Sequence, residues 1–522
     1  MLDIGQLDIL SLIIFAPVVG AIGLAVALPI LGALGRAPDA DGQLALMRWG
    51  ALGTSAVTFA LSLLLALAFD PAAQGFQLVQ EAAWIGFFGI EYKVGVDGIS
   101  LLLVMLTTLL TMISILASFG PITTRVKEYM IAFLVLETGM LGVFLALDLF
   151  LFYVFWEIVL VPMYLIIGVW GGANRIYATI KFVLYTLVGS LLMLVAILAM
   201  AWSYQGATGT WAGAFDYEEL LRFGFDPSLQ FWAFLGFFLA FAIKVPTWPF
   251  HTWLPDAHTE APTAGSVILA GVLLKLGGYG LIRFCLPLFP DASAQLAGIV
   301  IALSVIGMIY GAIVAVRQPD LKRLIAYSSV SHMGFVTLGI FIFSEQGLMG
   351  AVFQMVAHGI ITGGLFLLVG VIYERTHDRT IANMGGLGSR VPVFATLLVF
   401  FSLASAGLPA LAGFVGEFLV LLATVEYEPI LGYVAALTII FAAVYLLYML
   451  QNVVFGSLSD FLRNLGLRLT DVSPMEAATL APLVVLAVVF GIFPALILDL
   501  ITLPVETILA GLGQADTAGL AR

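Results

Sequence analysis

Apolar runs long enough to cross a lipid bilayer recur from one end of the sequence to the other. A transmembrane helix needs about 20 apolar residues, because the hydrocarbon layer is about 30 Å thick and a helix rises about 1.5 Å per residue. The chain is 62% hydrophobic and only 10% charged, with a mean hydropathy of +1.12. One soluble core could not bury so much apolar surface. The sequence therefore predicts an all-α, polytopic integral membrane protein.

We expect fourteen spans, most of them separated by short polar links. The fourth and fifth spans lie closest in sequence, since only a short link at Asp148 separates them. The expected spans are residues 8–33, 48–69, 97–119, 129–147, 149–171, 178–203, 229–250, 264–287, 294–316, 323–343, 346–373, 391–424, 429–455 and 477–510.

Lysine and arginine residues divide unequally between the two sets of alternate loops. One set holds only Lys93, Arg222 and Arg283. Positive residues collect on the cytoplasmic side of membrane proteins, so this division places both termini on the outer, periplasmic side. The cations of the other set are Arg36, Arg48, Arg125, Lys127, Arg175, Lys181, Arg317, Lys322, Arg323, Arg375, Arg379, Arg390, Arg463 and Arg468.

Charge and cysteine content exclude several classes of protein. The net charge of −12 argues against a nucleic-acid partner. The single cysteine, Cys285, excludes disulfides and any cysteine-held iron–sulfur cluster. The N-terminal flank carries Asp3 and Asp8 and no Lys or Arg, so we expect a retained first span and not a cleaved signal peptide.

Helix-breaking residues interrupt two of the expected spans. The stretch KVPTWPFHTWLPDAHTEAP breaks the seventh span at Pro246 and Pro249, and ASAGLPALAG breaks the twelfth around Gly407 and Pro409. The two interruptions lie five spans apart, and an odd offset predicts two halves that are inverted relative to each other, as in many transporters. Two unrelated proline kinks, which membrane helices tolerate, are the alternative.

Seven ionisable residues fall well inside the expected spans. A charge at the bilayer centre costs at least about 2.5–3.5 kcal/mol, so these side chains are expected to face one another or a hydrated interior. Carboxylates, lysines and histidines arranged in this way form proton relays, and broken helices leave room for the water that a relay requires. The seven residues are Glu137, Glu157, Lys244, Lys275, His332, His358 and Glu417.

Glu157 and Lys244 are the first candidates for a functional pair. Burial makes a lysine easier to deprotonate, and a neighbouring carboxylate makes it harder, so such a pair can alternate between holding and releasing a proton. Lys275, His332 and His358 would carry the proton onward to Glu417, beside the second break. The alternative is a buried ion pair that only sets helix register.

Other polar residues have simpler interpretations. His332 and His358 could be core histidines with satisfied hydrogen bonds. His251 and His258, with Asp256 and Glu260, could suggest a metal site, but a seven-residue histidine spacing is not a usual ligand pattern. Lys181 and Asp148 are expected near the span ends, in interfacial positions. Glu137 is either part of the entry route or a partner for another helix.

The region that holds the first break resembles a known family. KVPTWPFHTWLPDAHTEAPTAGSVILAGVLLKLGGYGL is similar to the core signature of the proton-translocating, antiporter-like membrane subunits of NADH:quinone oxidoreductase, or complex I. Multisubunit Na⁺/H⁺ antiporters belong to the same superfamily. The resemblance continues through FWEIVLVPMYLIIGVWGG, NRIYATIKFVLYTL, DLKRLIAYSSVSHMGF and LPALAGFVGEFL.

Three features resemble the subunit M branch of this family, which includes mitochondrial subunit 4. EYKVGVDGISLLLVMLTTLLT is similar to the entry into that branch's third span. Glu417 stands where the sister chains usually have a lysine. The sequence also stops soon after the fourteenth span, without the long lateral helix of the largest sister chain.

The resemblance implies two inverted five-helix repeats, spans 4–8 and 9–13. The corresponding divisions are residues 1–128, 129–290, 291–456 and 457–522. It also implies that Glu157, Lys244, Lys275, His332, His358 and Glu417 occupy the proton pathway of the family, to which we add Glu137.

The resemblance further implies a place in a larger assembly. Other complex I membrane subunits, above all the sister antiporter-like chains, would be the protein partners within a bacterial-type inner membrane. No cofactor is expected on this chain, and FMN, iron–sulfur clusters and quinone would belong to partner subunits.

Three rival functions remain open from the sequence. The nearest is a subunit of a multisubunit Na⁺/H⁺ antiporter. A haem-binding quinol oxidoreductase subunit could use His332 and His358 as axial ligands. A membrane scaffold is the third, although it would not need seven buried ionisable groups.

Overall fold

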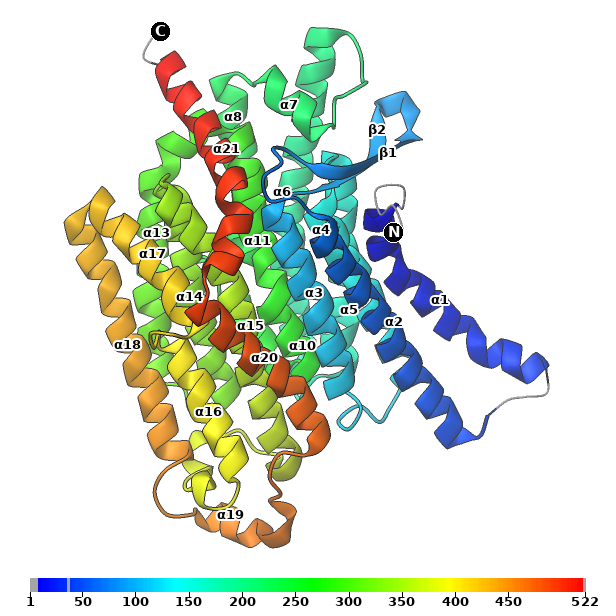
Figure 1. Cartoon of the computed structure of the whole chain (residues 1–522), viewed down its shortest axis with the longest axis vertical. Coiled ribbons are helices and arrows are strands. Elements are labelled where there is room, and N and C mark those ends of the chain that lie inside the picture. Colours follow the sequence, from blue (N-terminus) through cyan, green and yellow to red (C-terminus); the bar gives the residue numbers. More distant parts are fainter. Residues whose placement is uncertain (1–7, 35–37, 520–522) are drawn as a thin grey trace.

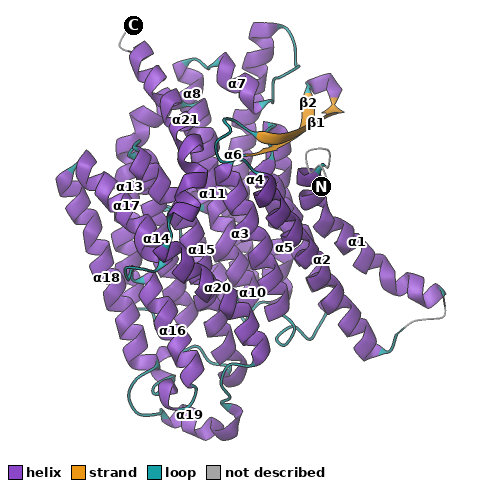
Figure 2. Ribbon diagram, in the orientation of Figure 1, coloured by secondary structure: helices purple, strands orange, loops and turns teal. Residues whose placement is uncertain are grey.

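The computed structural model of this protein describes residues 8–34 and 38–519, so Asp3 and Arg36 lie outside the described residues. Most of the described chain is helical, and the helices run side by side in a tall bundle (Figure 1, Figure 2). The helices are α1 (Ile9–Ala33), α2 (Ala40–Ala68), α3 (Gly98–Ala117), α4 (Val126–Leu145), α5 (Leu149–Trp170), α6 (Arg175–Thr208), α7 (Tyr217–Phe223), α8 (Pro227–Lys244), α9 (Trp253–Glu260), α10 (Thr263–Ile268), α11 (Leu274–Gly280), α12 (Leu286–Leu288), α13 (Pro290–Val316), α14 (Leu321–Phe341), α15 (Glu345–Thr376), α16 (Pro392–Ser405), α17 (Ala412–Tyr427), α18 (Pro429–Val453), α19 (Asp460–Leu465), α20 (Pro474–Ile492) and α21 (Ala495–Gly519).

Fourteen helical stretches among the described residues are long and apolar enough to cross a membrane. The number of spans agrees with the prediction, but the structure divides the expected twelfth and fourteenth spans differently. The expected twelfth span is divided into α16 and α17, each too short to cross alone, whereas the expected fourteenth span contains two qualifying helices, α20 and α21. The sequence analysis gave residues 477–510 as one span, and it did not predict the interruption between α20 and α21.

Local backbone chemistry explains both divisions. Between α16 and α17, Gly407 adopts φ +79°, a left-handed conformation that glycine reaches without steric cost. Between α20 and α21, Phe493 leaves the helical region (φ −121°, ψ 65°) because the following Pro494 disfavours it there. The two helices then continue end to end and together cross the height of the bundle (Figure 1).

The first interruption lies where the proline-rich stretch predicted it. α8 ends at Lys244, and α9 begins at Trp253 after a short turn that contains Pro246 and Pro249. The next span is one continuous path from Thr263 to Leu288. Within it, two π-helical turns, Leu269–Leu273 and Leu281–Cys285, flank α11.

A β-hairpin and two short helices occupy loops for which no structure was predicted. β1 (Gln77–Ile85) pairs antiparallel with β2 (Ile90–Val96). The hairpin and α7 lie at one end of the bundle, and α19 lies at the other (Figure 1). α1 begins and α21 ends toward the hairpin end of the bundle (Figure 1).

The most buried spans lie at the centre of the bundle. The apolar windows of the Thr263–Leu288 span and of α15 are entirely buried, and that of α14 is 94% buried. The corresponding windows of α2 and α18 are only 28% and 33% buried, so these peripheral helices present apolar side chains to their surroundings. Ionisable residues on the central helices are consequently shielded from lipid.

Polar caps satisfy the helix ends that would otherwise be left unpaired. Asp97 begins α3, and its carboxylate accepts a hydrogen bond from the amide of Ser100. Asp148, buried in the link between α4 and α5, accepts from the amides of Phe150 and Leu151. Such caps matter here because unpaired backbone groups are especially costly near the apolar layer. The inverted repeat stays a prediction.

Candidate functional site

The seven predicted site residues lie on seven different helices, and six of them are buried. Glu157 of α5 is half-buried. The other six are Glu137 of α4, Lys244 of α8, Lys275 of α11, His332 of α14, His358 of α15 and Glu417 of α17. The structure brings four of them, Lys275, His332, His358 and Glu417, into two directly bonded pairs.

The first pair joins α14 to the second half of the broken twelfth span. The Nδ1 atom of His332 lies 2.5 Å from Oε1 of Glu417. The same carboxylate oxygen accepts a hydrogen bond of 2.8 Å from the side-chain amide of Gln354. On the other edge of the ring, Nε2 lies 3.0 Å from the hydroxyl of Tyr445 and 3.1 Å from that of Ser405. Both edges of this imidazole are therefore within hydrogen-bond reach of proton-carrying groups.

The second pair joins α11 to α15. The Nζ atom of Lys275 lies 2.7 Å from Nδ1 of His358 and also donates to the carbonyl oxygen of Ala270. Ala270 belongs to the π-helical turn at Leu269–Leu273, and π-helical turns often occur at functional sites. Lys275 is fully buried, so these two contacts take the place of the hydrogen bonds that its amine would make to water.

The two pairs are adjacent. The ring centres of His332 and His358 are 6.1 Å apart. The Nε2 atom of His358 is buried and has no hydrogen-bond partner among the described residues. A row of ionisable groups therefore runs from Lys275 through the two histidines to Glu417, with direct bonds within each pair and a gap between the two histidine rings.

Glu157 and Lys244 lie in one neighbourhood without forming an ion pair. The Lys244 ammonium lies 5.4 Å from the ring centre of Trp156, which precedes Glu157, and 5.5 Å from that of Phe182. No carboxylate among the described residues lies within 4.0 Å of it. One carboxylate oxygen of Glu157 is buried and unpaired within the same part of the chain. The sequence analysis suggested a direct pair between Glu157 and Lys244. In the structure, the Lys244 ammonium instead lies near aromatic rings, whose faces attract cations.

Glu137 stands apart from this row. Its side chain is fully buried, and neither carboxylate oxygen has a hydrogen-bond partner among residues 8–34 and 38–519. The structure does not join it to any of the other six. A buried carboxyl with no partner is costly, which is consistent with a function and does not define one.

The side chains considered for a metal site point to different partners. Asp256 pairs with Lys181 at 2.7 Å and with Arg323 at 3.4 Å, so it anchors α9 to α6 and α14. His258 stacks on Phe366 with ring centres 4.6 Å apart. Within the described ranges, no three His, Cys, Asp or Glu residues are grouped to hold a metal ion.

The geometry also bears on haem ligation. Both ring nitrogens of His332 contact protein side chains, which leaves neither of them directed at an iron.

Several polar partners were missed by the sequence analysis. Tyr445, Ser405 and Gln354 are uncharged, so a search for ionisable residues inside spans does not find them. Two cations assigned to loops are instead buried within helices. Lys322 donates to the carbonyl oxygen of Ala261 at 2.6 Å, and Arg283 pairs with Asp97. Loop assignment failed for these two because each lies within about two turns of a span end.

Comparisons with known proteins agree on the family. A family model described as "NADH:quinone oxidoreductase/Mrp antiporter, TM" matches residues 146–445. The chain is 49% identical to NADH-quinone oxidoreductase subunit M of Rhodobacter capsulatus, over 95% of each chain. It is 42% identical to NADH-ubiquinone oxidoreductase chain 4 of Marchantia polymorpha, over 93% of this chain and 96% of the relative. A chain of respiratory complex I from Thermus thermophilus superposes with a TM-score of 0.82 at 34% identity, over 96% of this chain and 99% of that one.

Proposed function

Because the chain belongs to the family of NADH:quinone oxidoreductase and Mrp antiporter membrane subunits, we propose that it moves protons within the membrane part of a respiratory complex I. The names of its relatives, subunit M and chain 4, favour this assembly over a Na⁺/H⁺ antiporter. The energy for transport would come from electron transfer between NADH and quinone on other subunits.

The observation that carries the proposal is the buried row of Lys275, His358, His332 and Glu417. Proton transfer proceeds along short hydrogen bonds between groups that can both gain and lose a proton. Lys275 and His358 meet at 2.7 Å, and His332 and Glu417 meet at 2.5 Å. A proton that leaves Lys275 has His358 as its nearest titratable acceptor. The 6.1 Å between the centres of the two histidine rings is a distance that one water molecule can bridge.

Glu157 and Lys244 would supply the other end of the relay. The Lys244 ammonium is held by aromatic faces and not by a carboxylate, so its charge is stabilised only weakly. Movement of Glu157 toward it would favour the protonated amine, and movement away would favour release. The break after Lys244 leaves backbone groups that water can reach. Glu137 would be a seventh member whose place in the sequence of transfers is open.

The assembly would provide what this chain does not carry. FMN, iron–sulfur clusters and quinone would be bound by partner subunits, and this chain would have no redox centre. Sister antiporter-like chains of the membrane arm would be its neighbours. We place the protein in a bacterial-type inner membrane with both termini on the periplasmic side, because alternate loops carry very different numbers of Lys and Arg residues.

Replacing Glu417 tests this proposal. Glu417→Gln keeps the shape and can still bond Gln354, but it cannot take up a proton. We expect vesicles that contain the assembled complex to lose most NADH-driven proton uptake. Glu426→Gln is the matched control, because Glu426 is an exposed glutamate on the same helix.

The outcome is measured as protons moved per NADH oxidised, with complex assembly checked separately. A variant at Glu417 that moves protons at the parental ratio would remove this residue from the relay. Loss in both variants would point to a structural effect on α17.

A further inference from the structure

One face of the eighth span connects the relay to the hairpin end of the bundle. Lys275, Tyr279 and Arg283 follow one another at intervals of four residues, which places them on the same side of a helix. All three are buried, with exposures of 0%, 1% and 4%. Eight residues of helix rise about 12 Å, so Arg283 lies that far from Lys275 toward the hairpin end.

Tyr279 stands between the cationic residues Lys275 and Arg283 in the sequence of this helix. Its hydroxyl donates to the carbonyl oxygen of Phe144 at 3.0 Å. It also accepts a hydrogen bond of 3.2 Å from Nε of Arg283. Tyr279 therefore bonds Arg283 directly, and along this helix face it stands between Arg283 and Lys275 in the sequence.

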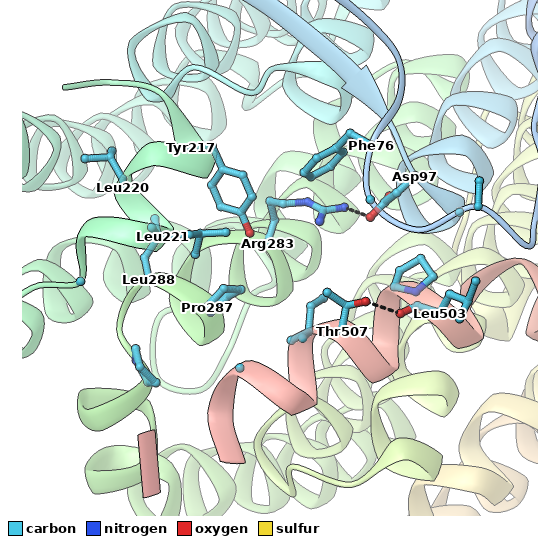
Figure 3. Close-up of a pocket in the computed structure, with 18 of the residues that line it drawn as sticks. Phe76, Asp97, Tyr217, Leu220, Leu221, Arg283, Pro287, Leu288, Leu503 and Thr507 are labelled. Atoms are coloured by element: carbon cyan, nitrogen blue, oxygen red, sulfur yellow. Dashed lines mark hydrogen bonds and ion pairs between the residues drawn. The ribbon is translucent and has the colours of Figure 1, made fainter. Parts of the chain in front are cut away.

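Several contacts hold the Arg283 guanidinium in place. One terminal nitrogen donates to the Asp97 carboxylate, which also caps α3. The guanidinium carbon lies 4.8 Å from the ring centre of Phe76. Figure 3 shows the guanidinium between Tyr217 and Phe76, with its end directed at Asp97. The second π-helical turn, Leu281–Cys285, contains Arg283.

A cavity lies directly beyond this pair. It has a volume of about 340 Å³, and Asp97, Arg283, Tyr217 and Gln230 are among its lining residues. Leu503 and Thr507 of α21 form another part of its wall (Figure 3). A water molecule occupies roughly 30 Å³ in the liquid, so the cavity has room for several of them next to the Asp97–Arg283 pair.

We propose that the Asp97–Arg283 pair is a closed gate between this cavity and Lys275. The gate prevents protons on the hairpin side from returning through Tyr279 to the relay. A guanidinium does not release its proton in proteins, so a chain of proton transfers stops where Arg283 fills the path. This inference rests on the proposed proton-translocating function.

A double replacement removes the charges and keeps polar groups at both positions. Removal of one partner alone would leave a buried unpaired charge, which is strongly destabilising. In Asp97→Asn with Arg283→Gln, we expect an imposed pH gradient across vesicles that contain the assembled complex to decay several-fold faster than in the parent, without NADH. Addition of Lys275→Ala should return the decay to the parental rate, because the leak would pass through that lysine.

The matched control neutralises another buried pair at the same end. Lys93 is joined to Asp216 at 2.5 Å and to the half-exposed Glu218 at 3.0 Å. These residues lie off the face of the eighth span, so Lys93→Gln with Asp216→Asn should not increase the leak. Arg283→Lys serves as a second test, since it keeps the charge opposite Asp97 while introducing an amine that can lose a proton. We expect it to leak as well.

Three results would overturn the gate. They are a parental decay rate in both Arg283 variants, an equal leak in the Lys93 control, and a leak that persists after Lys275→Ala. The measurement uses no electron transfer, so it fails or succeeds independently of the Glu417 experiment.

Discussion

The hydroxyl groups of Tyr445 and Ser405 both lie within hydrogen-bond distance of the same ring nitrogen of His332. The distances from Nε2 to the two hydroxyl oxygens are 3.0 and 3.1 Å. A single ring nitrogen engages one good hydrogen-bond partner at a time. Either hydroxyl can therefore satisfy Nε2 when the other is removed.

The expected effects follow from this redundancy. Tyr445→Phe or Ser405→Ala each removes one neutral hydrogen bond, which contributes about 0.5–1.5 kcal/mol at most. The double variant leaves Nε2 unpaired in a buried site, at a cost of about 1–3 kcal/mol. Since about 1.4 kcal/mol is a factor of ten in rate, the single variants should slow NADH-driven proton transport by a few-fold. The double variant should slow proton transport by a factor larger than the product of the two single-variant factors.

A double-mutant cycle on the assembled complex measures this directly. The readout is the rate of NADH-driven proton uptake by vesicles for the parent, each single variant and the double. Tyr448→Phe is the control, because Tyr448 lies one turn further along α18 and its side chain is exposed. Additive losses, or singles as damaging as the double, would refute the idea that the two hydroxyls substitute for each other at His332.

Two further predictions concern other parts of the chain. Lys244→Ala and, separately, Glu157→Ala should abolish most coupled proton transport while the complex still assembles; transport at the parental rate in either variant would exclude that residue. Asp378 lies in the loop after α15. Partial burial acts to raise the pKa of its carboxyl group, but hydrogen bonds from Asn383 and Thr380 outweigh that effect, so the pKa is lowered overall. The folded loop is therefore stabilised above the ordinary aspartate pKa of about 3.9 and loses this contribution as pH falls through the lower folded value. Amide protection at Thr380 should decrease over that acidic range in the parent but not in Asp378→Asn, and equal acid sensitivity in the two would contradict this origin.

Much of the architecture could be predicted because it depends on local sequence. Membrane spans follow from the length of apolar runs, and the first break follows from Pro246 and Pro249, whose effect on the helix is local. The division between α20 and α21 was missed even though Pro494 is a local signal. A single proline inside a long apolar run is also compatible with a mild kink, and the run is long enough for one tilted span.

The candidate site could be predicted only in part. Each of its ionisable residues was visible as an unusual residue inside a span. Their partners were not, since Tyr445 and Ser405 lie more than seventy residues from His332 in the sequence. Placing an uncharged polar residue in the membrane costs little free energy, so such a residue inside an apolar span is not recognised as unusual from the sequence. Arg283 and Lys322 were placed in loops because an ionised residue close to a span end can either reach the interface or be buried.

The sequence alone determined that this is a many-spanning helical membrane protein with ionisable groups in its interior, because the bilayer allows few other ways to satisfy such an apolar chain. Only the tertiary structure decided which of those groups meet. It joined Lys275 to His358 and His332 to Glu417, left Lys244 among aromatic rings, and set Arg283 against Asp97. Hydropathy is a property of one segment, whereas each of these contacts depends on how two or more helices pack side by side.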